Sequence, residues 1–136
     1  MDGRLVVVTT NPRAEAPYAP ENVATKEVVG ADAFFALDLR AGRVVSVDDH
    51  PEARNPSVRL GVDFGPVIGV LHTLAQVTNY PAEQLIGRMV VGAVNLGPKR
   101  IAGFKSQFLV LGAYEPDGTC RLLQVEEGIE PGAPIA

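Results

Sequence analysis

Residues 95–113 read NLGPKRIAGFKSQFLVLGA, and they join a cationic turn to an apolar run. Glycine and proline near the start favour the turn, and the apolar run is long enough for a buried strand. The stretch also holds three cations and three neutral polar side chains: Lys99, Arg100, Lys105, Asn95, Ser106 and Gln107. Such groups, held by a rigid turn over a buried strand, suit recognition of a polyanion backbone. The stretch supplies no nucleophile with a matching base, so it predicts binding rather than catalysis.

The basic side chains of the protein are concentrated around this stretch. The net charge of the 136 residues is −4, yet residues 33–113 carry eight basic and six acidic side chains. Residues 1–32 carry three basic and five acidic side chains, and residues 114–136 carry one and five. Local fields steer a charged ligand more than the total charge does, so a polyanion partner fits the middle of the chain. An uneven surface charge without functional meaning is the alternative explanation.

Length and composition indicate one globular domain. No apolar run approaches the ~20 residues of a membrane span, and the amino terminus lacks the basic segment and apolar core of a secretory signal. The single cysteine, Cys120, has no internal disulfide partner, which fits a reducing compartment. We therefore expect a cytoplasmic protein that does not insert into membranes.

Strand patterns fill most of the chain between residues 39 and 125. Alternating or β-branched runs predict strands at residues 39–47, 57–64, 67–78, 88–94, 104–114 and 120–125. Pro81 and Gly87 bracket a single helical turn between the third and fourth strands. Evenly spaced strands with a helical turn at that place predict an all-β fold, the five-stranded oligonucleotide/oligosaccharide-binding (OB) barrel.

The chain before this barrel is expected to form an extension over residues 1–31, with the barrel domain over residues 32–136. Three prolines make residues 11–22 unsuitable for a regular element. The β-branched run Leu5–Thr9 predicts a short strand. The extension is then either mobile or paired with the edge of a sheet.

A short helix is expected at residues 33–37, with the Asp32 carboxylate as its amino-terminal cap. The helix carries a large apolar load for its length: Phe34, Phe35 and Leu37. These side chains either plug the end of the core or contact a second subunit, because one short helix cannot bury two adjacent rings alone.

Six segments in order resemble the tRNA-binding domain family. They are FFALDLRAG (34–42), HPEAR (50–54), DFG (63–65), AQVT (75–78), YPAEQLIG (80–87) and VNLGPKRIAGFKS (94–106). The resemblance covers about residues 32–136 and is strongest to the CsaA branch of the family. It implies an OB barrel, a homodimer and tRNA as the ligand, with no cofactor. Proteins of the CsaA branch are also thought to hold unfolded preproteins for secretion.

Eight side chains are candidates for contact with tRNA: Arg54, Gln76, Asn95, Lys99, Arg100, Lys105, Ser106 and Gln107. The cations pair with phosphate oxygens, and arginine does so through a planar fork. The amide and hydroxyl groups suit phosphates, 2′-hydroxyls or base edges. For Asn95 and Ser106 the alternative is capping of loop backbone. For Phe104 the alternatives are stacking on an unpaired base and a plug between strand and loop.

Catalysis is not expected. The run Asp48-Asp49-His50 does not define a coordination geometry, and the sequence has no Cys-x-x-Cys or His-Glu-x-x-His spacing for a metal. Cys120 has no identifiable histidine partner. Two functions therefore remain. One is a tRNA-binding module that acts as a dimer. The other is a secretion chaperone that binds unfolded preproteins through an apolar surface at or near the dimer interface, formed by residues such as Leu71, Leu74 and the Phe34-Phe35 pair.

Overall fold

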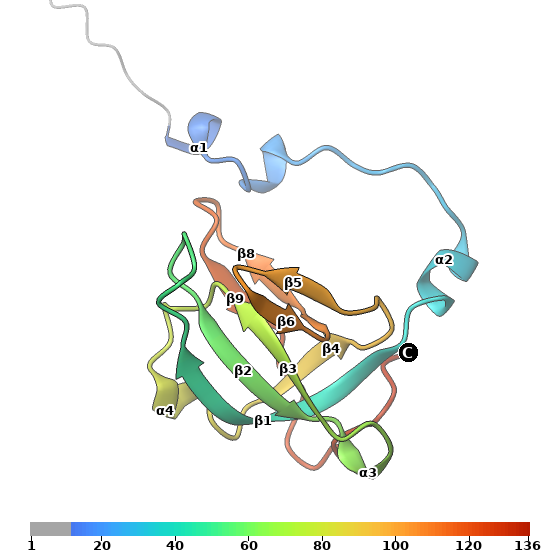
Figure 1. Cartoon of the computed structure of the whole chain (residues 1–136). Helices are drawn as coiled ribbons and strands as arrows, with labels where there is room; N and C mark the ends of the chain where they lie inside the picture. The colour runs from blue at the N-terminus through green and yellow to red at the C-terminus, as the bar shows by residue number, and fades with distance from the viewer. Residues whose placement is uncertain (1–11) are drawn as a thin grey trace, which may run out of the picture.

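The computed structural model describes residues 12–136, which fold around a nearly closed five-stranded antiparallel barrel (Figure 1). Its strands lie in the order β3-β2-β1-β4-β7. They are β1 (Leu39–Asp49), β2 (Val58–Asp63), β3 (Val70–Ala75), β4 (Met89–Ala93) and β7 (Leu109–Val110). The predicted all-β OB barrel is therefore confirmed, while the predicted strand at Leu5–Thr9 lies outside the described residues.

Strand β1 can serve both halves of the barrel because it bends. Its first half pairs with β4 and its second half pairs with β2. The register shifts between Val44 and Ser46, and such a β-bulge increases the local bend and twist. At Gly42 an added Cβ would lie 2.5 Å from a Val62 methyl and 2.7 Å from the Phe64 ring. The glycine therefore allows the core aromatic side chain to pack directly on the β1 backbone.

The core fills the barrel with aliphatic side chains and two phenylalanine rings. Phe64 and Phe108 meet edge to face with 5.0 Å between ring centroids, a favourable arrangement for aromatic pairs. Every residue of β4 is buried, and this strand lies between β1 and β7 in the sheet. The predicted helical turn is present as α4 (Ala82–Leu85), and its Leu85 is fully buried in the core.

Two predicted strands are divided in the structure. Residues 67–78 form α3 (Gly65–Ile68) followed by β3, because Gly69 takes a positive φ of 79° that ends the helical turn. Residues 104–114 form three short strands: β6 (Phe104–Ser106), β7 and β8 (Gly112–Tyr114). The first pairs with β5 (Lys99–Ile101), and β8 pairs with β9 (Cys120–Leu122). The predicted single strand is wrong because its residues pair with three different partners.

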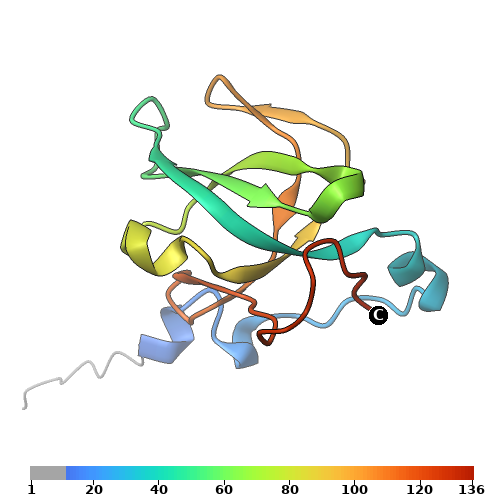
Figure 2. The ribbon, with the colours of Figure 1, turned by 90° about the horizontal axis from the view of Figure 1, so that it is seen from below.

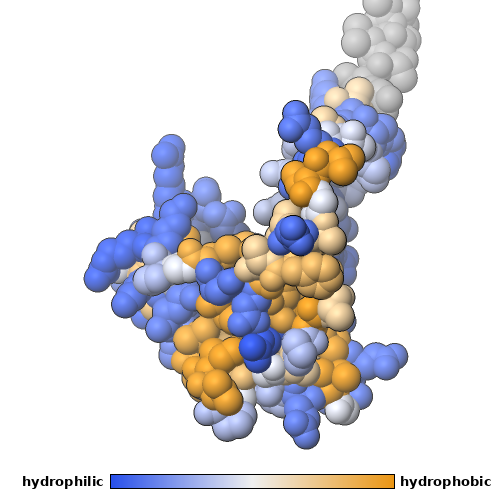
Figure 3. All heavy atoms as spheres, turned by 90° about the vertical axis from the view of Figure 1, so that its right-hand side faces the viewer, coloured by the Kyte–Doolittle hydropathy of each residue, from blue (hydrophilic) through white to orange (hydrophobic). Residues whose placement is uncertain are grey.

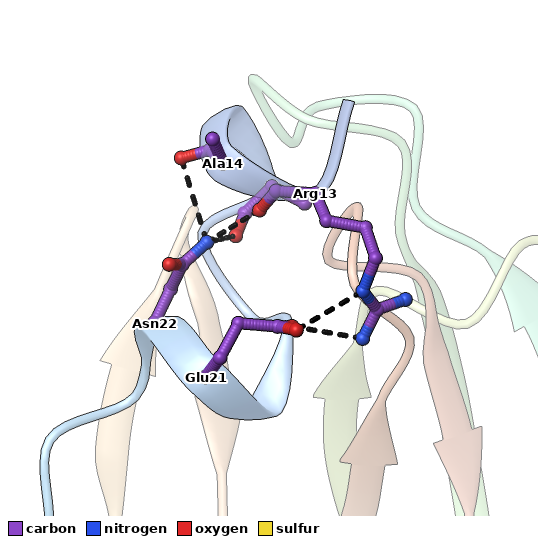
Figure 4. Close-up of polar contacts among 5 residues, drawn as sticks. Arg13, Ala14, Glu21 and Asn22 are labelled. Atoms are coloured by element: carbon purple, nitrogen blue, oxygen red, sulfur yellow. Dashed lines mark hydrogen bonds and ion pairs between the residues drawn. The ribbon is translucent and has the colours of Figure 1, made fainter. Parts of the chain in front are cut away.

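The described part of the amino-terminal extension contains α1 (Pro12–Glu15) and η1 (Pro20–Asn22), so the expectation of no regular element there is wrong. Proline is tolerated at the first turn of a helix, where its missing N–H has no partner to lose. Figure 4 shows the contacts that join the two turns: Arg13 forms a two-point ion pair with Glu21, and the Asn22 amide donates to the backbone carbonyls of Arg13 and Ala16.

The described residues of this extension dock on the β8–β9 hairpin. The Tyr18 ring stacks on Tyr114 at 4.4 Å between centroids, and the Tyr18 N–H donates to the Pro116 carbonyl. Ala19 beside it is fully buried. The chain then runs through exposed residues to α2 (Ala31–Phe35). The predicted Asp32 cap is wrong, since α2 begins after Gly30 and no side chain caps it.

The carboxyl-terminal tail runs beside the first half of β1 (Figure 2). The backbone N–H groups of Gly132 and Ile135 donate to the carbonyls of Ala41 and Leu39, and the Ala41 N–H donates to Ala133. The tail therefore occupies the edge that β2 leaves open on this half of the strand. Among the helices of residues 12–136, none has the length and apolar character needed to cross a membrane.

Candidate nucleic-acid interface

The predicted cations lie on a β-hairpin formed by β5 and β6. Its register places Lys99 opposite Ser106, Arg100 opposite Lys105 and Ile101 opposite Phe104. Directly opposed side chains share a face of a hairpin and successive ones alternate between faces. Arg100 and Lys105 therefore share one face, while Lys99 lies on the other face with Ile101, Phe104 and Ser106. The sequence predicts three cations on one surface, but only Arg100 and Lys105 share a face of the hairpin.

The two cations on the shared face are exposed and carry no acidic partner within residues 12–136. Lys99 is likewise exposed and outside any ion pair of the described chain. The Arg100 guanidinium donates one hydrogen bond, to the Gly103 carbonyl at 3.1 Å, which fixes its position over the turn. Most of the donors of Arg100 and Lys105 thus remain available for an anionic ligand.

The turn of this hairpin has an unusual conformation for its sequence. Ala102 and Gly103 form a two-residue loop with φ of 49° and 78°, the signs of a type I′ turn. Ala102 is the one non-glycine residue with positive φ in the described chain. A side chain in the left-handed region costs about 1–2 kcal/mol. Contacts outside the turn must therefore stabilise it.

Ser106 and Gln107 close the barrel at the base of the hairpin. The Ser106 hydroxyl lies 2.8 Å from the Thr73 hydroxyl and accepts from the Leu74 N–H at 3.0 Å. Gln107 bonds His72 twice, through its backbone N–H and its side-chain carbonyl. Ser106 is only 5% exposed. These polar groups join β3 to the chain entering β7, so their hydrogen bonds are used inside the barrel.

Asn95 holds the junction between α2 and β1. Its side-chain carbonyl accepts from the Asp38 N–H at 2.8 Å, and its amide donates to the Ala36 carbonyl at 2.9 Å. Both ends of the side chain are therefore engaged with backbone, which is the capping alternative considered for this residue. The Asn95 side chain therefore fixes the segment that connects α2 to β1.

Gln76 and Arg54 lie away from the hairpin cations. Gln76 is exposed and lines a cavity of about 290 Å³ with residues of β3 and the β8–β9 hairpin. Arg54 is exposed on the β1–β2 loop and lines a second cavity of about 330 Å³. His50 also lines this cavity. The structure thus brings Arg100 and Lys105 together and distributes the other candidate residues around them.

An apolar groove of about 350 Å³ lies between β3 and the inner face of the β5–β6 hairpin. Its lining includes Leu74, Leu96, Pro98, Ile101, Leu109 and the cation Lys99. The apolar surface predicted from the sequence includes Leu74, but periodicity alone does not show that Leu74 and Leu109 line the same groove.

Of the groups considered for catalysis, Asp48 and Asp49 are exposed, His50 is held by neighbours and Cys120 is partly buried. The His50 side chain is buried, with Nε2 2.9 Å from the Ala102 carbonyl and Nδ1 2.9 Å from Arg59 Nε. Burial raises the pKa of the Cys120 thiol, which disfavours the reactive thiolate. Within the described residues no three His, Cys, Asp or Glu side chains gather as metal ligands.

A nearly closed five-stranded antiparallel barrel is the architecture of the OB fold, which occurs in proteins that bind oligonucleotides and oligosaccharides. The chain belongs to the putative tRNA-binding domain family, whose model matches residues 39–134. The family resemblance predicted from the six sequence segments is therefore confirmed.

Solved structures of similar proteins share this fold. The CsaA chaperone protein of Picrophilus torridus is 40% identical with a TM-score of 0.75, over 80% of this chain and 100% of that chain. The chaperone CsaA of Bacillus anthracis is 41% identical with a TM-score of 0.76, over 81% and 100%. A methionine–tRNA ligase of Xylella fastidiosa is 35% identical over 119 residues, 86% of this chain and 17% of the ligase. The chain spans less than a fifth of the length of such curated ligases.

Proposed function

We propose that this protein is a non-catalytic tRNA-binding module that contacts the sugar–phosphate backbone through the outer face of the β5–β6 hairpin. The observation that carries the proposal is the cross-strand pair of Arg100 and Lys105, exposed and without acidic partners in the described chain. Two neighbouring cations suit consecutive phosphates, and a folded RNA is recognised largely by its shape and backbone. Lys99, on the other face of the hairpin, and Arg54, on the β1–β2 loop, remain predicted contacts outside this face. The proposed module needs no cofactor and acts in the cytoplasm.

Replacing Arg100 and Lys105 together by alanine tests this proposal. Because a hydrogen bond to a charged group contributes about 1.5–3 kcal/mol, the double variant should bind tRNA at least about tenfold more weakly. The slope of log affinity against log salt concentration should lose about two, one for each phosphate contact. Arg121→Ala is the matched control, since Arg121 is exposed and paired with Glu115. Unchanged affinity and slope for the double variant would remove the hairpin from the binding site.

We infer that the module is a homodimer that uses α2 as its contact. Phe35 is 72% exposed, and Phe34 and Leu37 are each 41% exposed. Figure 3 shows apolar surface on the side of the molecule that carries α2. Exposed rings on a single short helix are a poor arrangement for a monomer in water. Two barrels related by a two-fold axis would also double the number of phosphate contacts available to one tRNA.

A second function, binding of unfolded preprotein segments, is favoured by the apolar groove beside Leu74, Ile101 and Leu109. A groove of about 350 Å³ suits one or two apolar side chains of an extended peptide. Competition between tRNA and an unfolded, apolar peptide tests the relation of the two functions. Independent binding would show that the peptide and tRNA use separate sites, as expected if the peptide takes this groove, whereas mutual exclusion would show a shared site.

A further inference from the structure

The β5–β6 hairpin depends on contacts from the β1–β2 loop for its position. Its strands are three residues each, and an isolated two-stranded hairpin is at best marginally stable in water. Ser106 and Gln107 hold only its base. At the other end the imidazole of His50 lies 2.9 Å from the carbonyl of Ala102, the residue with the positive φ. His50 is 5% exposed, so this contact is shielded from water.

The neighbours of His50 define which ring nitrogen carries the proton. Arg59 Nε can only donate, so it donates to His50 Nδ1 at 2.9 Å, and Nδ1 is therefore unprotonated. The remaining proton is on Nε2, which donates to the Ala102 carbonyl. Glu52 is the other charged group at this ring, with its carboxylate 3.3 Å from Nδ1 and 3.7 Å from Arg59 Nη2. The acceptor at Nδ1 and the donor at Nε2 fit a neutral imidazole.

Phe104 adds a second attachment between the same two segments. Its ring meets the His50 ring edge to face at 5.8 Å, and the Arg59 guanidinium lies over it at 5.3 Å. Such cation–π and edge-to-face contacts are each favourable. Phe104 is thus packed between strand and loop, the plug alternative, and its ring is not free for stacking on a base.

We propose that His50, as its neutral Nε2–H tautomer, is a positioning residue of the RNA interface. By donating to Ala102 it holds the strained turn in place, and the turn in turn presents Arg100 and Lys105 on one face before RNA arrives. This inference rests on the proposed tRNA-binding function. A binding surface that is ordered in the free protein loses less freedom on association. If the competent hairpin were populated only about a tenth of the time, the apparent dissociation constant would rise about tenfold.

Three variants separate this role from general support of the fold. His50→Ala removes the donor to Ala102, and His50→Gln keeps a donor at nearly the same reach. The third variant, Ala102→Asn in the His50→Ala background, restores the turn by another route, because Asn-Gly is the preferred type I′ sequence. We expect His50→Ala to reduce amide-exchange protection of residues 99–106 and to weaken tRNA binding about tenfold. His50→Gln should stay within about twofold of the unaltered chain.

The second-site variant gives the decisive readout. It should regain hairpin protection and tRNA affinity even if its thermal unfolding midpoint remains that of His50→Ala, because it repairs the turn and not the buried site of His50. If the tRNA affinity of the second-site variant stays as low as that of His50→Ala whenever its unfolding midpoint does, the proposal is wrong. So would full hairpin protection in His50→Ala, or nitrogen NMR spectra of the unaltered protein that place the His50 proton on Nδ1. If the unaltered chain binds no tRNA, the proposed function fails, while the exchange and NMR results still decide whether His50 holds the hairpin.

Discussion

At the scale of single residues, several polar side chains predicted to contact RNA complete the fold instead. Ser106, Gln107 and Asn95 all suit RNA contact by residue type, yet each spends its hydrogen bonds on backbone or on another buried side chain. Their partners are 32 to 59 positions away in sequence. Because sequence pattern describes neighbours along the chain, it identified these residues as important polar positions but not what they bind.

Ser106→Ala should lower the free energy of unfolding by about 1–3 kcal/mol, because it leaves the buried Leu74 N–H without its acceptor. Chemical denaturation measures this change. The salt dependence of tRNA binding should keep its slope, since no phosphate contact is removed. Gln76→Ala is the control, because Gln76 is exposed and its truncation should change stability by less than about 0.5 kcal/mol. A Ser106 variant with unchanged stability and a reduced salt slope would place this hydroxyl on the RNA instead.

At the scale of elements, the sequence predicts a turn correctly where the residues of the turn carry a strong local signal, and it misses a turn whose local signal is weak. The proline and glycine around α4 predicted that turn correctly, since both residues act through their own backbone. The sequence pattern predicts a loop followed by one long strand where the structure has the β5–β6 hairpin. The hairpin is missed because Ala102-Gly103 lacks the Asn-Gly or Asp-Gly signal of its turn type. Its conformation comes from His50 and Phe104 beneath it, which no local pattern reveals.

The docking of the amino-terminal extension also belongs to this scale. Tyr18→Ala should remove the stack on Tyr114, a contact of about 0.5–1.5 kcal/mol beyond its buried area. Amide exchange over residues 13–22 should then accelerate severalfold, while exchange in the barrel strands stays the same. Val28→Ala is the matched control, because Val28 is fully exposed. Unchanged exchange in the Tyr18 variant would show that the Arg13–Glu21 and Asn22 contacts keep α1 and η1 folded without the stack.

At the scale of the whole molecule, the fold separates apolar and cationic surfaces. The cations Arg100 and Lys105 lie on the hairpin, and exposed rings gather on α2 at the start of β1. Composition gave only a net charge of −4 with an excess of cations in the middle of the chain. The spatial separation follows from the barrel topology, which places the hairpin before β7 and α2 before β1. If α2 is the dimer contact, as proposed, dimerisation and RNA binding by the hairpin use different surfaces.

Phe34→Ser combined with Phe35→Ser should therefore lower the dimer fraction at micromolar concentration, as measured by light scattering or sedimentation. Each exposed ring that is buried on association contributes about 1.5–3 kcal/mol, so loss of both should be clearly detectable. Val67→Ser is the control, because Val67 is 92% exposed on α3. A monomeric unaltered chain, or a double variant that dimerises as well as the unaltered chain, would exclude α2 as the contact.

The carboxyl-terminal tail along β1 has a practical consequence for work with this protein. Gly132, Ala133 and Ile135 are hydrogen-bonded to the first strand of the barrel, so these last residues are part of its sheet. Trimming them during expression, or pulling them away with a rigid fusion partner, would uncover a row of unpaired backbone groups on β1. Uncovered sheet edges recruit strands from other molecules. Purification handles are therefore better placed ahead of Pro12, and preparations clipped near Glu130 should be watched for self-association.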